Sequence, residues 1–294
     1  MDFKTLIQEK QNINQAALAV PMALGPNDKF TPFKHALDEQ NPDAVIWQAD
    51  AIADDFSKEV IWDQVKQGGA NAVDEGDMSA MKKASMKAEL DKAYEEFIGN
   101  WPEIQKQIVQ ELVQNAAQTV NGRYLFLSYS NKEEGGLGEM TPADQAFFLV
   151  TALKVSNGAF SAVYLPETLD ENLQEKIREA AKEAGVMVIE TMTMPDLDED
   201  TIQSTYKAFD EAGSDIVNMQ VSTDVLGAAE VSDVEAYLSE LQNDIPVMVT
   251  MTGELTKDQV EAWLVFPSAL VTLALGENYQ TPIIKSTVRE LGWA

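Results

Sequence analysis

Polar but mostly neutral side chains lie at the ends of the apolar runs in this sequence. Side chains of a strand alternate between its two faces, so positions of one parity near the strand ends should converge. None of the runs contains Lys, Arg or His. Amide and hydroxyl groups hydrogen-bond a neutral polar molecule, but they supply neither an amine nucleophile nor a strong base. The residues predicted to bind a ligand on this basis are Gln48, Asp50, Ser130, Glu134, Thr193, Asn218 and Thr252.

Two members of this set, Asp50 and Glu134, are carboxylates. They could act as acid and base if both face one cavity. A metal site would need more convergent His or carboxylate ligands, so we expect no metal and no cofactor. The sequence has no Cys, which excludes disulfides, thiolate metal sites and Cys nucleophiles.

The charge of the chain restricts its partners. Acidic residues number 49 and basic residues 21, which gives a net charge of −28. A polyanion repels nucleic acid and anionic membrane surfaces, so we expect neither as a partner. The start of the chain, MDFKTLIQEKQNIN, has no secretory signal pattern, and no apolar run is long enough to cross a bilayer. These features predict a cytoplasmic protein.

Eight short apolar runs alternate with helical segments along the chain. Nearly continuous apolar runs are typical of parallel strands that are covered on both faces. Such alternation predicts a (β/α)8 barrel over residues 1–294, in a single domain. An open doubly wound sheet is the alternative. Such a sheet usually has a Gly-rich turn after its first strand, but this sequence has Pro26-Asn27-Asp28 there. The predicted strands are 16–24, 43–50, 124–130, 159–165, 186–194, 215–222, 245–252 and 269–275.

One connection is too long for such a barrel. Residues 51–123 separate the second and third strands, about twice what a crossover helix needs. Residues 101–118 are enough for that helix, so 57–100 is predicted to be a helical insertion, with a loop over 68–77. An insertion after a barrel strand lies on the catalytic face. We weigh three roles for it: a lid, a dimer contact or a helical decoration packed on the barrel.

Five segments resemble one known family, the type I 3-dehydroquinate dehydratases, which are barrel enzymes of the shikimate pathway. The resemblance spans residues 18–284, except for 57–100, and the family is often dimeric, which implies a homodimer. The segments are AVPMALGPN at the first strand, DAVIWQAD at the second, LSYSNKEEGG at the third, AGSDIVNMQVS at the sixth and VFPSALVTLALGE near the C-terminus.

The catalytic residues of that family are replaced in this chain. The Schiff-base lysine falls on Asn218, and the catalytic histidine falls on Thr193. The Glu and Arg of the second strand fall on Ile46 and Gln48, and the Arg of the third strand falls on Ser130. The family uses arginines to bind a carboxylate substrate and joins its ketone to lysine, so each cationic group for that task has a neutral replacement. Retained are Asp50, Glu134, Gly135 and Gly136.

Three functions remain open. The first is a pseudoenzyme of the dehydratase type, whose polar cup binds a neutral small molecule or fills the barrel. The second is an active dehydratase that uses displaced residues such as Lys285. The third is another lyase, with Asp50 and Glu134 as acid and base.

Overall fold

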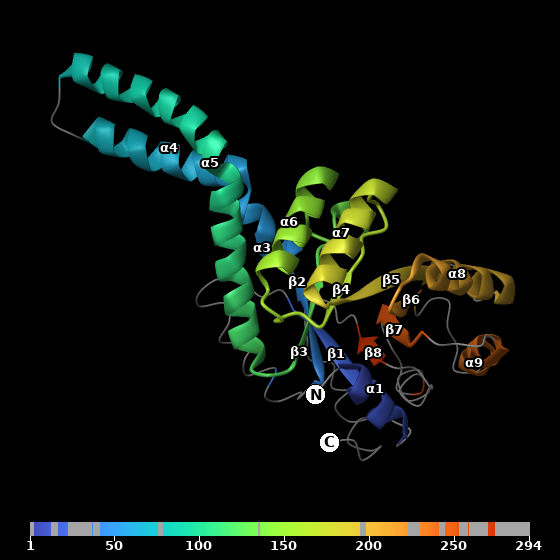
Figure 1. Cartoon of the computed structure of the whole chain (residues 1–294). Coiled ribbons are helices and arrows are strands. Elements are labelled where there is room, and N and C mark those ends of the chain that lie inside the picture. Colours follow the sequence, from blue (N-terminus) through green and yellow to red (C-terminus); the bar gives the residue numbers. More distant parts are fainter. Residues whose placement is uncertain are drawn as a thin grey trace.

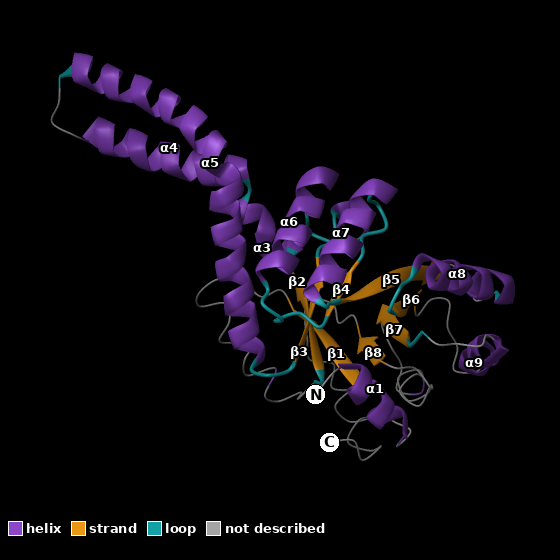
Figure 2. Ribbon diagram, in the orientation of Figure 1, coloured by secondary structure: helices purple, strands orange, loops and turns teal. Residues whose placement is uncertain are grey.

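The computed structural model describes residues 3–12, 17–22, 37, 42–75, 79–134, 136–194, 198–222, 230–240, 245–252, 258 and 270–273. In this part of the chain, strands form a central parallel sheet with helices outside it (Figures 1 and 2). No helix of the described residues is both long enough and apolar enough to cross a bilayer.

Each of the eight strands lies within its predicted range, and all are parallel. The order is β1 to β8 in sequence, and β1 pairs with β8, so that the sheet closes on itself. The α/β class with a parallel sheet is therefore confirmed. The strands are β1 (Ala17–Met22), β2 (Ala44–Gln48), β3 (Tyr124–Ser128), β4 (Ala162–Tyr164), β5 (Met187–Met194), β6 (Ile216–Ser222), β7 (Val247–Thr252) and β8 (Leu270–Leu273).

Local capping interactions fix where the helices after β3, β4 and β5 begin. Thr141 caps α6 by accepting a hydrogen bond from the Asp144 N–H, and Asp170 and Asp198 cap α7 and α8 in the same way. Gly185 and Gly213 end α7 and α8 with φ of 68° and 81°, a conformation that glycine adopts without steric cost. The helices that follow β3, β4, β5 and β6 are α6 (Pro142–Val155), α7 (Glu171–Ala184), α8 (Glu199–Ala212) and α9 (Glu230–Glu240).

Apolar side chains pack on both sides of the sheet. Outside, Trp47 stacks on Phe160 with ring centroids 6.1 Å apart, and the core continues to α5 (Ala80–Val120), α6 and α7. Inside, Phe126, Ile189, Ile216 and Met248 belong to one cluster. Helix α1 (Phe3–Asn12) closes the end of the barrel where the strands begin. Its Phe3 ring meets Tyr124 and Phe126 edge-on at 5.0 and 4.9 Å. The interior is thus closed on that side.

The connection between β2 and β3 differs from the prediction in two respects. The loop predicted over 68–77 is wrong for residues 68–75, because α4 (Lys58–Glu75) runs through both Gly68 and Gly69. The helix predicted at 101–118 does not start there either, since α5 (Ala80–Val120) is one helix of 41 residues with Pro102 inside it. Figure 1 shows α5 bending sharply, as proline makes helices do.

Some predicted elements lie outside the described residues. The sequence pattern also predicts helices at 31–40, 256–264 and 286–291, and apart from Leu37 and Asp258 these lie outside the described residues. The alternation of all eight strands with eight helices, and the single domain over 1–294, therefore remain predictions.

Candidate functional site

A layer of neutral side chains crosses the barrel near the middle of β5, β6 and β7. Asn218 is only 3% exposed and occupies the middle of it. Its Nδ2 donates to Thr191 Oγ1 at 3.2 Å, and its Oδ1 accepts from Thr250 Oγ1 at 2.7 Å. Three adjacent strands are tied together by one amide. Below this layer the interior is apolar, and Tyr164 Oη lies 3.3 Å from Met248 Sδ.

Above this layer, at the ends of β3 to β6, lies a cavity of about 300 Å³. Hydroxyl groups, an amide and carboxylates line it, and no Lys, Arg or His is among the described residues that line it. These described residues offer a carboxylate ligand no cation, whereas they offer a neutral hydroxyl-bearing molecule many hydrogen-bonding groups. The lining residues are Tyr129, Ser130, Glu133, Glu134, Tyr164, Leu165, Pro166, Glu167, Thr168, Thr191, Thr193 and Gln220. We call this space the mouth cavity.

Glu134 holds the loop after β3 in place. Its Oε2 accepts from the Asn131 N–H at 3.0 Å. Its Oε1 accepts from Thr168 twice, from the backbone N–H at 3.2 Å and from Oγ1 at 3.1 Å. Both oxygens are thus engaged in joining the loops that follow β3 and β4.

Asp50 has a similar role on the other side of that loop. It is buried at the start of α3 (Asp50–Ala53), and its Oδ2 accepts from the Leu137 N–H at 3.0 Å. It is not among the residues that line the mouth cavity. Pairing Asp50 with Glu134 as acid and base requires both in one cavity, and the structure does not place them so.

Glu167 was missed by the sequence reasoning and lines the mouth cavity beside Glu134. The pKa of its carboxyl is raised, first by desolvation and then by the negative charge of Glu134. A signal for it exists in the sequence, because Glu167 follows closely after the fourth apolar run. The same rule that selects polar residues after the other apolar runs also selects Glu167.

The other predicted positions are distributed unevenly. Ser130, Glu134 and Thr193 line the mouth cavity, and Asn218 lies next to it through Thr191. Gln48 ends β2, is half-buried and does not line that cavity. The side chain of Thr252 and all of Gly135 and Lys285 lie outside the described residues. Among the described residues, no group of three or more His, Cys, Asp or Glu could hold a metal ion.

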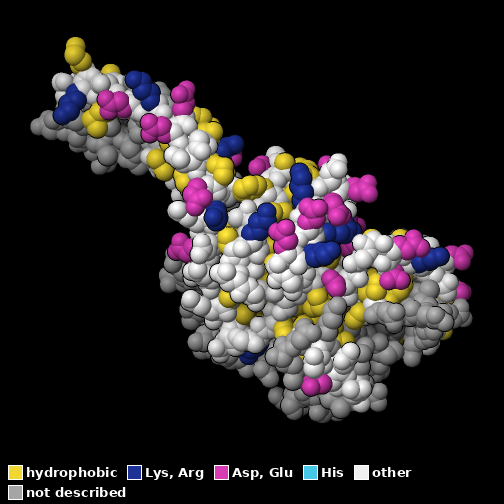
Figure 3. Space-filling model, viewed as in Figure 1, with side chains coloured by type: hydrophobic (Ala, Val, Ile, Leu, Met, Phe, Trp, Pro, Cys, Tyr) yellow, Lys and Arg dark blue, Asp and Glu magenta, His cyan; other side chains and the backbone are white. Residues whose placement is uncertain are grey.

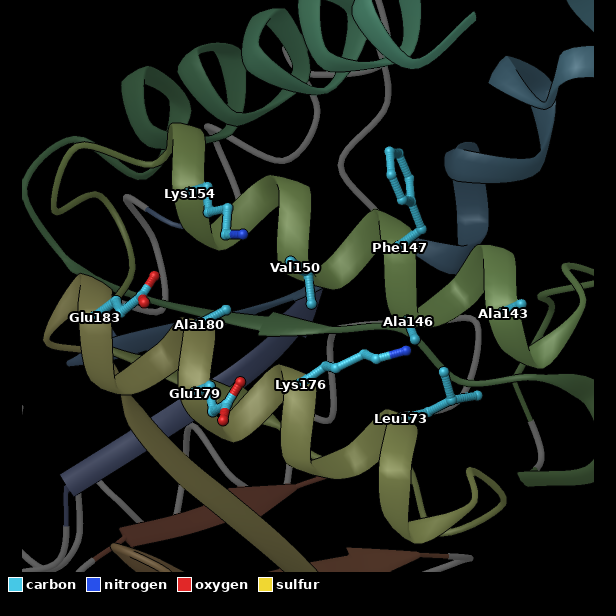
Figure 4. Close-up of a pocket in the computed structure, with 10 residues that line it drawn as sticks. All are labelled: Ala143, Ala146, Phe147, Val150, Lys154, Leu173, Lys176, Glu179, Ala180 and Glu183. Carbon is cyan, nitrogen blue, oxygen red and sulfur yellow. The ribbon is translucent and has the colours of Figure 1, made fainter.

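Two further hollows lie outside the barrel. One, of about 370 Å³, lies beside β5 and shares Glu167, Thr191 and Thr193 with the mouth cavity. The other, of about 320 Å³, is a groove between α6 and α7 (Figure 4). Its floor is apolar, and its lysines and glutamates stand on exposed helix faces. The mouth cavity is therefore the candidate site, because strand ends converge on it alone among these three.

Comparison with known proteins identifies the fold. The chain superposes on the type I 3-dehydroquinate dehydratase from Clostridium difficile with a TM-score of 0.63 and 12% identity, over 94% of this chain and 92% of that one. For the 3-dehydroquinate dehydratase from Geobacillus kaustophilus HTA426 the TM-score is 0.62 and the identity 16%, over 95% and 92%. The chain has the fold of the type I 3-dehydroquinate dehydratases.

This likeness extends to barrels with other activities. Tryptophan synthase from Mycobacterium tuberculosis matches with a TM-score of 0.53 and 13% identity, over 99% of this chain and 96% of that one. No protein-family model and no curated protein matches the sequence. At these identities the comparisons show the fold alone, and any chemistry depends on the residues that line the mouth cavity.

Gly136, one of the two glycines kept from the dehydratase pattern, stands where a side chain would not fit. A Cβ at Gly136 would overlap the carbonyl group of Ser130, which is rigid backbone. The Gly136 N–H donates to Asn131 O at 3.0 Å, and the Gly138 N–H donates to Ser130 O at 3.1 Å. The loop after β3 thus folds back closely over the strand end, which forms one wall of the mouth cavity.

We expect Gly136→Ala to lower the free energy of unfolding by about 1–3 kcal/mol, because the loop must move away from Ser130. Gly99→Ala is the matched control. No atom lies within 4 Å of a Cβ placed at Gly99, and this residue is inside α5. That control should gain about 0.5–1 kcal/mol from helix propensity. Urea unfolding measures both variants, and equal stabilities would contradict the close approach.

Proposed function

We propose that this chain is a divergent protein of the type I 3-dehydroquinate dehydratase kind that does not carry out Schiff-base dehydration. In this proposal the barrel has the full (β/α)8 form, with α4 and the first half of α5 as an insertion. Its mouth cavity binds a neutral, hydroxyl-bearing small molecule, and the protein works in the cytoplasm. The cysteine-free sequence is consistent with that location.

The main support is Asn218, at the position that the resemblance aligns with the lysine. Its amide is buried and hydrogen-bonded on both sides, to Thr191 and Thr250. An amide forms no Schiff base with a ketone. The described residues that line the mouth cavity include no Lys, Arg or His, which supports the preference for a neutral ligand.

A second candidate is acid–base catalysis by two carboxylates. Glu134 and Glu167 line the same cavity. The raised pKa of Glu167 makes this side chain easier to protonate than an ordinary glutamate. One group could then donate a proton while the other accepts one. This pair replaces Asp50 and Glu134 in the lyase hypothesis.

The test is incubation with 3-dehydroquinate. Dehydroshikimate formation is followed by ultraviolet absorbance, and borohydride trapping is read by intact mass. We expect neither turnover nor an adduct. Turnover with an adduct would overturn the proposal and direct attention to lysines such as Lys285. Turnover without an adduct would support the carboxylate pair, and Glu167→Gln should then abolish it.

Binding is tested with two cyclitols of similar size, myo-inositol as the neutral probe and quinate as the anionic probe. We expect a concentration-dependent rise in melting temperature with inositol alone. The variant Thr193→Val removes one hydroxyl from the cavity wall and should weaken this effect. A rise with quinate alone would contradict the preference for a neutral ligand.

A further inference from the structure

The helical insertion forms an arm that stands away from the barrel. We define the arm as α4 together with residues 80–101 of α5. Figures 1 and 3 show it projecting outward rather than covering the barrel. Among its described side chains, none is buried. A pair of helices without a buried core is only marginally stable alone, because helices in proteins gain most of their stability from packing.

The packing within the arm comes from a short ladder of aromatic rings. Trp62 meets Tyr94 at 5.0 Å and Phe97 at 5.2 Å, and Phe97 meets Trp101 at 5.5 Å. The ladder lies where the arm joins the barrel and remains partly exposed. Of the six exposed large apolar residues in the described chain, four belong to the arm: Val60, Val65, Met81 and Tyr94.

Charge is segregated along the arm half of α5. Residues 80–92, at the far end, include Lys82, Lys83, Lys87 and Lys92 against Glu89 and Asp91. Residues 93–103, next to the barrel, include Glu95, Glu96 and Glu103 and no basic residue. A locally basic segment is unusual in a chain with a net charge of −28. The neighbouring segment of α5 carries the opposite charge, and α4 adds Lys58 and Lys66 against Glu59, Asp63, Asp74 and Glu75.

We propose that the arms of two copies pair antiparallel, so that four helices form one bundle about a two-fold axis. Antiparallel pairing places the basic segment 80–92 of one copy beside the acidic segment 93–103 of the other. The two-fold axis repeats this contact. Parallel pairing would oppose like charges instead. The exposed faces of Val65 and Tyr94 would become part of the bundle core, as apolar positions do in four-helix bundles.

The same arrangement avoids repulsion between the barrels. The arm half of α5 is about 33 Å long at 1.5 Å per residue, and antiparallel arms place the barrels at opposite ends of the bundle. Charges farther apart than about 8 Å are largely screened at physiological salt. Direct contact between barrel surfaces would bring two strongly acidic bodies together. The arm is therefore the surface through which a second copy can bind.

The test is light scattering after size exclusion on the full chain. We expect twice the chain mass of 32.4 kDa. Tyr94→Glu places a charge in the predicted bundle core and should raise the dissociation constant at least about tenfold. Tyr94 is 40% exposed, so the folded monomer should tolerate the change, and circular dichroism checks this. A monomer at all concentrations up to about 100 µM would overturn the proposal. A Tyr94→Glu dimer with an unchanged dissociation constant would overturn it as well.

A charge exchange tests the antiparallel direction. Lys82→Glu and Glu96→Lys should each weaken the dimer about three- to tenfold, and the double variant should recover it. Lys176→Glu is the matched control, because it makes the same charge change on α7, away from the arm, and should leave the dimer unchanged. A double variant weaker than both single variants would contradict antiparallel pairing.

Discussion

Replacing Arg178 with methionine is expected to lower the free energy of unfolding by about 2–3 kcal/mol, or the melting temperature by roughly 5–10 °C. Arg178 lies on α7 and forms an ion pair with Glu190 of β5. The Glu190 carboxylate also accepts a hydrogen bond from Ser214 Oγ, and its side chain is only 7% exposed. Methionine keeps most of the apolar stem but leaves this buried carboxylate without its cation.

The pH dependence of this loss has a definite sign. Without Arg178, burial should raise the pKa of Glu190 in the folded state above its unfolded value of about 4.3. The penalty is therefore present above the folded pKa and absent below the unfolded pKa. The difference between variant and parent should narrow as the pH falls from 7 towards 4, as measured by thermal unfolding at each pH.

A double replacement measures the energetic coupling between Arg178 and Glu190. Arg178→Met with Glu190→Leu removes both charges, so no buried charge remains unpaired. We expect the double variant to be more stable than Arg178→Met alone, because well-packed apolar residues often replace a buried ion pair at little cost. If the double variant loses as much free energy of unfolding as the two single variants together, then Arg178 and Glu190 are not energetically coupled.

The sheet was predictable from the sequence because its strands are nearly continuous apolar runs, the pattern of strands that are covered on both faces. Burial on both faces makes a strand nearly continuous in apolar residues, and that pattern is visible without any knowledge of neighbours. Helix ends were visible for a local reason as well, since Gly185 and Gly213 take a left-handed conformation. The course of residues 68–75 was not visible, because Gly68 and Gly69 indicate a loop, whereas the structure continues α4 through them.

The chemistry of the site was less predictable, because it depends on contacts between distant segments. Asp50 and Glu134 match the dehydratase pattern, and both hold the loop after β3 through its backbone N–H groups. Asp50 and Leu137 are 87 positions apart in the sequence, and only the fold reveals that they are in contact. Residue type alone could not separate carboxylates that fix a loop from Glu167, which faces the mouth cavity.

Replacing Asn218 with aspartate is expected to destabilise the protein by about 2–3 kcal/mol at pH 7.5. The two side chains have nearly the same shape, so the change tests hydrogen bonding and charge rather than volume. The carboxylate has no donor for Thr191 Oγ1 and would be ionised in a buried layer. The Thr250 hydroxyl can still donate to it, which limits the loss.

Acid should reverse this effect. Burial raises the pKa of the new carboxyl in the folded state above the unfolded value of about 3.9. Destabilisation is then complete above the folded pKa and is lost as the pH falls towards the unfolded value. Thermal unfolding at pH 7.5 and pH 4 measures the difference. Asn100→Asp, the same change on an exposed face of α5, should stay within about 0.5 kcal/mol of the parent at both pH values.

The result bears directly on why this barrel should form no Schiff base. A costly Asn218→Asp variant would mean that the layer beneath the mouth cavity is dry and has its hydrogen bonds satisfied. A ligand in the cavity would then meet a closed amide layer at the sixth strand, where the dehydratase pattern has its lysine. A variant as stable as Asn100→Asp would instead mean that water reaches this layer. The cavity would then extend down to Asn218, and this amide would itself be a ligand-binding group.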